Sequence, residues 1–133
     1  MRKNIKLRVK NLVNKYQTAD PFALAKELDV NILYVPLPEK IRGILVRVLR
    51  KKTILLNDKL NYEAQKIVIC HELGHVRMHW HAGYFFQHEG IYYSPARYEC
   101  EANEFAIHLL NYSSDFIYDK DYKSEKKDYG FFT

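Results

Sequence analysis

Hydrophobic residues recur at helical spacing in four stretches of the chain. In residues 4–16 they fall every three or four positions, with lysines and arginines between them, as in an amphipathic helix. A second, short helix is expected to start at Pro21, because Thr18-Ala19-Asp20 carries an N-cap candidate and proline suits the first helical position. The same spacing returns in residues 61–79 and 96–110. We therefore predict two N-terminal helices, a central helix and a later helix.

Runs rich in β-branched and aliphatic residues predict strands between the second helix and the central helix. These runs cover residues 30–37, 43–49 and 53–57. The last two are separated by Arg50-Lys51-Lys52, which indicates an antiparallel hairpin with a basic tip. No repeat or Gly/Ser-rich linker divides the 133 residues, so we expect a single domain. The predicted fold class is α+β, with N-terminal helices and a small, mainly antiparallel sheet packed on the two later helices.

The central helix carries His71-Glu72-Leu73-Gly74-His75, an H-E-x-x-H motif in the helical setting that it requires. Two histidines four residues apart project from one helical face, close enough to bind one Zn²⁺. Glu72 adjoins the first histidine and can act as general base toward a water molecule that the zinc activates. Residues 67–70 are too apolar for a surface helix whose histidines bind nothing.

A hydrolytic zinc site needs a third protein ligand, which we expect from the later helix. Glu99 and Asn103 share one face of that helix, whereas Glu101 is turned away from Glu99 by roughly 200°. We predict that Glu99 is the ligand and that Asn103 is a hydrogen-bond partner of a ligating histidine. Glu101 and Glu104 are then solvated helix charges, although Glu101 stays an alternative ligand because a predicted helix register can slip by a residue or more.

The remaining histidines offer a competing arrangement. His81 lies six residues after His75, as in the metzincin signature H-E-x-x-H-x-x-G-x-x-H, but Met78 stands where that signature has the glycine that turns the chain. We therefore do not expect His81 to bind the metal. We interpret His79 as a helix-end residue that favours the helix dipole. Two others are interpreted as ordinary polar residues, His88 and His108.

Peptide hydrolysis also requires a donor that stabilises the developing oxyanion. We expect this donor in the loop between the two later helices. The sequence does not choose among the candidates there, which are Tyr84, Tyr92, Tyr93, His81 and His88.

The amino-acid composition indicates the class of protein and the compartment in which it acts. Apolar residues make up 47% and charged residues 28% of the chain, as in a folded soluble protein. No uncharged stretch reaches the ~18 residues of a membrane span, and no apolar segment follows the basic N-terminus. We expect a cytoplasmic protein in which Cys70 and Cys100 are free, buried thiols.

The net charge is +5, and six basic residues, two before the first helix and four within it, precede the first acidic residue, Asp20. We interpret this helix as having a solvated basic face, and direct nucleic-acid binding is not expected. The tail, residues 111–133, is expected to pack loosely.

Two segments of the chain carry a family resemblance. The sequence H-E-L-G-H at residues 71–75, followed by E-C-E-A-N-E-F-A-I-H-L-L at residues 99–110, resembles the ImmA/IrrE metallopeptidases, which pair H-E-L-G-H with E-x-E-A-N-x-F-A-x-x-L-L. The resemblance extends over about residues 20–110, including the hairpin. It implies zinc bound by two histidines and a glutamate, intracellular proteolysis, and a helix-turn-helix repressor as substrate in a phage or mobile-element circuit. The chain departs from many relatives in its short C-terminus, which lacks a proline soon after Leu110.

We therefore predict a cytoplasmic zinc endopeptidase that acts on a protein substrate, with His71, His75 and Glu99 as zinc ligands and Glu72 as base. The alternative is a non-catalytic, zinc-stabilised regulatory module that binds a repressor or DNA. The presence of Glu72 weighs against this alternative, because a purely structural zinc site has no need of a base. The sequence leaves the oligomeric state open.

Overall fold

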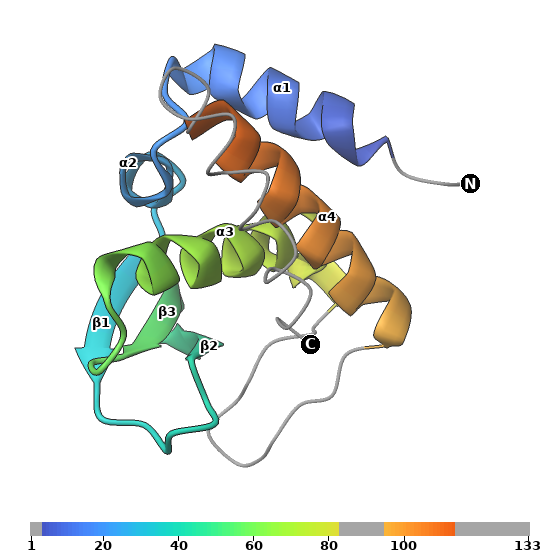
Figure 1. The fold of residues 1–133 in the computed structure, drawn as a ribbon. Helices are drawn as coiled ribbons and strands as arrows, with labels where there is room; N and C mark the ends of the chain where they lie inside the picture. The colour runs from blue at the N-terminus through green and yellow to red at the C-terminus, as the bar shows by residue number, and fades with distance from the viewer. Residues whose placement is uncertain (1–3, 83–94, 114–133) are drawn as a thin grey trace.

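The computed structural model describes residues 4–82 and 95–113, and these form an α+β fold (Figure 1). The fold class predicted from the sequence is confirmed. The helices and strands follow in this order: α1 (Ile5–Tyr16), α2 (Pro21–Glu27), β1 (Asn31–Val35), β2 (Gly43–Val48), β3 (Lys51–Asn57), α3 (Tyr62–Met78), the 3₁₀ turn η1 (Trp80–Ala82) and α4 (Ala96–Ser113). Because α4 runs to Ser113, the first residues of the expected loose tail are helical, and residues 114–133 lie outside the described part of the chain.

Short polar side chains define where three of the helices begin. The Asn4 side chain accepts a hydrogen bond from the Leu7 backbone N–H at 3.1 Å, and Asn61 accepts one from Ala64 N–H at 2.8 Å. Asp20 caps α2 in the same way, just ahead of the proline at its first position. Each cap satisfies an N–H group that would otherwise lack a partner in the first helical turn. These starts agree with the sequence prediction.

The three strands form a mixed sheet in the order β1-β3-β2. β2 and β3 pair antiparallel, with Gly43 opposite Leu56 and Val48 opposite Lys51, so the expected hairpin is present. Its tip is Leu49-Arg50, whose φ angles of 51° and 68° suit a two-residue hairpin turn, and Lys51 and Lys52 belong to β3. β1 pairs with β3 in parallel, which makes the sheet mixed.

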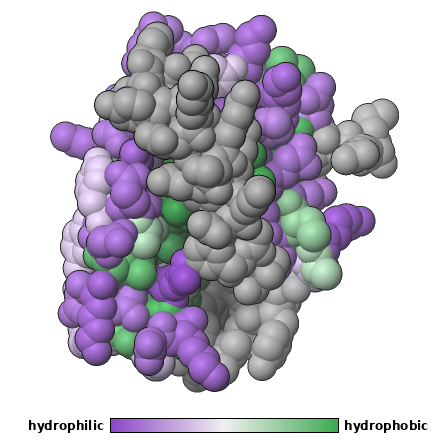
Figure 2. Space-filling view, in the orientation of Figure 1, coloured by the Kyte–Doolittle hydropathy of each residue, from purple (hydrophilic) through white to green (hydrophobic). Residues whose placement is uncertain are grey.

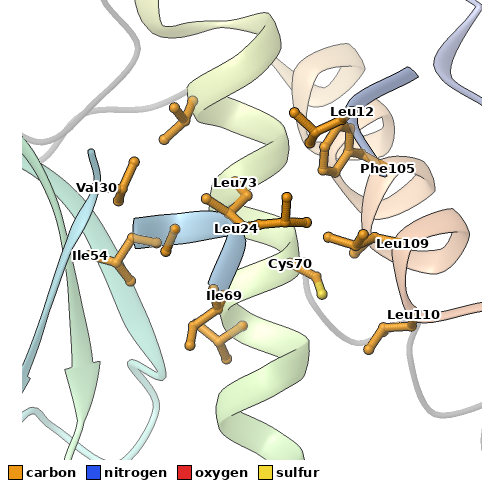
Figure 3. Close-up of a cluster of buried hydrophobic side chains, with 14 of the residues drawn as sticks. Leu12, Leu24, Val30, Ile54, Ile69, Cys70, Leu73, Phe105, Leu109 and Leu110 are labelled. Atoms are coloured by element: carbon orange, nitrogen blue, oxygen red, sulfur yellow. The ribbon is translucent and has the colours of Figure 1, made fainter. Parts of the chain in front are cut away.

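Helix α3 lies at the centre of the molecule, between the sheet and α4, and α1 packs across α4 (Figure 1). Figure 3 shows the buried side chains on both sides of α3: Val30 and Ile54 face it from the sheet side, and Phe105, Leu109 and Leu110 face it from α4. The middle of α3, from Val68 to Val76, is therefore buried along its whole circumference. Polar residues in this stretch need partners inside the protein.

The visible surface of the described part is mainly hydrophilic, with hydrophobic residues showing in small patches (Figure 2). None of the helices in this part is long and apolar enough to cross a membrane.

Gly74 allows α3 and α4 to approach closely. A Cβ atom at this position would lie 3.1 Å from the Cβ of Phe105 and 3.2 Å from the Cα of Ala102. Phe105 and Ala102 are fully buried, and one of these contacts is backbone, so neither can move aside easily. The glycine in the middle of H-E-L-G-H thus sets the separation of the two helices that carry the histidines and the later glutamates.

We expect Gly74→Ala to destabilise the protein. The added methyl group overpacks the contact between α3 and α4 at a cost of about 1–3 kcal/mol, of which the better helix propensity of alanine offsets about 1 kcal/mol. Urea unfolding of the purified variant measures the net change in the free energy of unfolding. Arg77→Ala, at an exposed position of the same helix, is the control and should change that free energy little. A Gly74→Ala variant more stable than the wild type would show that the two helices can separate freely.

Candidate metal centre

The two histidines of the H-E-x-x-H motif lie one turn apart in the buried middle of α3. His71 is 5% exposed and His75 is 2% exposed, and their rings meet edge to face with centroids 4.9 Å apart. Both rings are on the side of α3 that faces the start of α4, because residues four apart share a helical face. The motif therefore presents two imidazoles to one point between the helices.

Glu99, in the first turn of α4, completes a cluster with these histidines. Its carboxylate lies 3.2 Å from Nε2 of His71 through Oε1 and 2.9 Å from Nε2 of His75 through Oε2. One ligand atom from each of the three residues lies within 4.8 Å of the others. The structure thus brings together the three residues that the sequence analysis selects as ligands.

The chemistry and spacing of this cluster suit a metal ion. Two imidazole nitrogens and one carboxylate oxygen are a ligand set found in catalytic metal sites, which leave a fourth position open. Ligands at about 2.0–2.2 Å in a tetrahedron are separated by roughly 3.3 Å. The distances of 3.2 Å and 2.9 Å from Glu99 to the two histidines are close to that value. His71, His75 and Glu99 could therefore hold an ion.

The local electrostatics favour the charged form of His71. Burial by itself lowers the pKa of this imidazole, but the hydrogen bond to Glu99 and the charges of Glu72 and Glu99 outweigh burial and raise the pKa. Asn103, one turn after Glu99 on α4, makes a smaller contribution in the same direction. The site is thus strongly cation-attracting, as expected where carboxylates converge on buried imidazoles.

Glu72 is buried next to the cluster. Its side chain is removed from water, and this burial raises the pKa of the carboxyl group above its usual range. The charges of His71 and His75 lower the pKa, and the charge of Glu99 raises it, so all three cluster residues act on Glu72 electrostatically. A carboxyl group with a raised pKa is a stronger base than an ordinary glutamate when it is ionised.

Beyond the cluster, the structure shows a pair of a buried histidine and a partly buried glutamate that the sequence analysis missed. His79 is the C-cap of α3, as expected of a helix-end residue, but it is fully buried and its Nδ1 lies 2.9 Å from Nδ1 of His75. Its Nε2 lies 2.7 Å from Oε1 of Glu101. The interpretation of Glu101 as a solvated charge is therefore wrong, and its side chain is only 17% exposed. The side chain of Glu104 is 44% exposed, so this glutamate is more solvated than Glu101.

Both Glu99 and Glu101 reach α3 because Ala102 lies between them around the helix. Ala102 is the residue of α4 that contacts Gly74, and it is about 60° from Glu99 and about 100° from Glu101. The side chains of Glu99 and Glu101 therefore lie on opposite sides of the contact between Ala102 and Gly74. The 200° separation does exclude Glu101 from the cluster, since the metal-binding group in the described residues contains Glu99 and not Glu101.

The other predicted candidates lie away from the cluster or outside the described residues. His81 is exposed in η1, and His108 faces Glu104 on the surface of α4 at 3.5 Å. Cys70 is buried, which raises the pKa of its thiol, but Cys100 is exposed, so the expectation of burial is wrong for Cys100. Four candidates for the oxyanion donor lie outside the described residues: Tyr84, His88, Tyr92 and Tyr93.

We expect His81→Ala to leave the metal content of the protein unchanged. The side chain is exposed and is not part of the His71, His75 and Glu99 group, and Met78 continues α3 where a metzincin chain would turn. Elemental analysis of the purified variant after incubation with zinc measures the effect. Loss of zinc from this variant, with an unchanged circular dichroism spectrum, would indicate a metzincin-like ligand set.

Comparison with known proteins identifies the family of this chain. The family profile described as the IrrE N-terminal-like domain, peptidase M78, matches residues 25–127, a range that contains α3 and α4. The chain is 38% identical over 106 residues to "Uncharacterized immunity region protein 2" of Bacillus phage phi105, and the alignment covers 80% of this chain and 67% of that protein. No solved structure matches the chain significantly. With the profile spanning most of its length, the chain belongs to the IrrE N-terminal-like (peptidase M78) family.

Proposed function

We propose that this protein is a zinc-dependent endopeptidase. The observation that carries the proposal is the meeting of His71 and His75 from α3 with Glu99 from α4, beside the buried carboxyl group of Glu72. Membership of the peptidase M78 family supports the same activity. Zinc suits two imidazoles and one carboxylate with an open fourth position, and in such a site it supplies a Lewis acid that activates water and polarises a carbonyl group.

The roles of the side chains follow from their positions. His71 and His75 would hold the ion through Nε2, the atoms that face Glu99, and Glu99 would contribute a carboxylate oxygen. Glu72 takes a proton from the attacking water and delivers it to the nitrogen of the leaving amine. Its burial supports this role, because a raised pKa brings the carboxylate closer to the basicity that proton transfer at neutral pH requires.

The proposed substrate is a helix-turn-helix transcriptional repressor of a phage or mobile element. The relative from phage phi105 is called an immunity region protein, and that name supports a role in the regulation of phage immunity. A repressor acts in the cytoplasm, which is the compartment we propose for this chain. The competing function is a zinc-stabilised module that binds the repressor without cleaving it, and the buried Glu72 beside the cluster favours the enzyme.

Zinc content and cleavage test the proposal together. We expect the purified chain to bind about one zinc per molecule after reconstitution, because three converging ligands form one open site. We also expect it to shorten a repressor encoded beside its gene, with loss of cleavage when zinc is removed by a chelator. Elemental analysis and gel electrophoresis are the measurements. A chain that takes up no zinc would refute the metal site, and a zinc-loaded chain that leaves neighbouring repressors intact would favour the binding module.

A further inference from the structure

The pair of buried His79 and partly buried Glu101 lies next to one of the proposed ligands, His75. The ring of His79 joins the two, since its Nδ1 is 2.9 Å from His75 and its Nε2 is 2.7 Å from Glu101. The chain of contacts therefore runs from the carboxylate of Glu101 through His79 and His75 to the point where Glu99 and His71 converge. It joins residues from α3 and α4 and contains two of the most deeply buried polar side chains of the described residues, His75 and His79.

The hydrogens in this chain can be assigned once the proposed ligand role is given to Nε2 of His75. A neutral imidazole that uses Nε2 as a ligand carries its hydrogen on Nδ1, and this hydrogen then lies between the two Nδ1 atoms of His75 and His79. His79 must accept it, so the hydrogen of His79 is on Nε2 and is donated to Oε1 of Glu101. Each of these nitrogen and oxygen atoms then has one defined role.

We infer that His79 and Glu101 are positioning residues, which hold His75 in the ring orientation and tautomer that direct its Nε2 toward the metal. This inference rests on the proposed zinc site. A partner that accepts the Nδ1 hydrogen of a ligating histidine makes its Nε2 a stronger ligand. The usual partner is a carboxylate or a backbone carbonyl in direct contact, whereas here an imidazole stands between the ligand and the carboxylate.

The surroundings of His79 hold its ring in place. The ring of Tyr98 stacks on it with centroids 4.1 Å apart and an angle of 10° between the planes. His79 is fully buried, so water cannot easily replace it as the partner of His75. A substitution can separate the effect of this stacking from the effect of the hydrogen bonds of His79. Phenylalanine at this position keeps a flat ring against Tyr98 but has no nitrogen atoms.

We expect His79→Phe to bind zinc roughly 10- to 100-fold more weakly than the wild type, which is the effect typical of losing such a partner. Glu101→Gln should show a smaller loss, because its amide oxygen can still accept the hydrogen of His79 but carries no charge. Competition with a chromogenic chelator, on the full chain, measures each affinity. Glu104→Gln is the matched control, since this glutamate of the same helix has a side chain 44% exposed and pairs loosely with His108 at 3.5 Å, and its zinc affinity should not change.

A spectroscopic measurement separates positioning from a general effect on folding. In ¹⁵N-labelled, zinc-loaded wild type, histidine NMR should show the Nδ1 hydrogen of His75 protected from exchange with water, and His79→Phe should lose this protection. Thermal unfolding of the His79→Phe chain without added zinc shows whether this variant is folded. If it is not folded, the zinc affinity of Glu101→Gln, which is close in shape to the wild type, tests the inference instead. Zinc affinities equal to wild type in both variants would overturn the inference alone. A wild-type chain that binds no zinc would overturn the proposed function and this inference together.

Discussion

Glu72→Gln is expected to keep the fold and the zinc content of the protein while lowering the rate of substrate cleavage by at least about 10²- to 10⁴-fold, the usual contribution of a general base. Glutamine has nearly the volume of glutamate and can still form hydrogen bonds, but its amide cannot accept a proton from the attacking water. The substitution is tolerable because it removes a buried carboxyl group, whose pKa burial raises, and leaves a neutral side chain.

The cellular level of a cognate repressor measures this prediction even before the cleaved bond is known. The wild-type gene should lower the amount of intact repressor seen by immunoblotting, and the Glu72→Gln gene should leave it unchanged. Glu63→Gln is the matched control, because Glu63 lies in the first turn of the same helix, is 75% exposed and is paired only with Lys66 at 3.8 Å. If the Glu72→Gln and wild-type proteins lower the repressor equally, the protein acts by binding and not by hydrolysis.

Local sequence signals were sufficient to predict most of the elements. The cap ahead of Pro21, the helical spacing and the pairing of the two hairpin strands depend on residues close in the chain, and the structure shows each of them. The tip of the hairpin differs because positive φ angles at Leu49 and Arg50 make a two-residue turn, although neither residue favours that conformation. Periodicity alone does not reveal such a turn.

The order of the sheet depends on contacts between distant residues. β3 lies between β1 and β2, and the buried side chain of Asn57 holds the segment between those two strands. Its amide group donates hydrogen bonds to the carbonyl oxygens of Leu37, Pro38 and Ile41, 16 to 20 residues away in the chain. An asparagine at the end of a strand usually indicates only a turn, so the sequence had no signal for this parallel pairing.

The metal centre likewise has features that the sequence predicts and features that depend on contacts between distant residues. Helical spacing places His71 and His75 on one face and separates Glu99 from Glu101, and both statements hold in the structure. The contact of Glu101 with His79 depends instead on how closely α3 and α4 approach each other at Gly74. The spacing of residues within one helix does not determine the distance between two helices. One signal was available, because His79 follows His75 by four residues and so extends the face of the two histidines.

The largest effect on metal binding is expected from Glu99→Ala. The substitution removes the only ligand that α4 contributes to the cluster in the described residues and leaves two histidines from a single helix. We expect zinc affinity to fall further than the roughly 10- to 100-fold typical of partners outside the ligand set, so that the variant loses zinc during dialysis. Elemental analysis before and after dialysis, with chelator competition for the affinity, measures the difference from the wild type.

The ranking of three glutamates on one helix makes this prediction specific. Glu99→Ala should cost most, Glu101→Ala should cost less because it acts through His79, and Glu104→Ala should cost little because its partly exposed side chain is not part of the cluster. Because all three substitutions replace glutamate with alanine in α4, their effects on intrinsic helix propensity are similar, although Glu99 also lies in the first turn near the positive end of the helix dipole. A larger loss from Glu101→Ala than from Glu99→Ala would make Glu101 the ligand and Glu99 its neighbour. That result would contradict the ligand role given to Glu99 on the basis of its distance of 2.9 Å from His75.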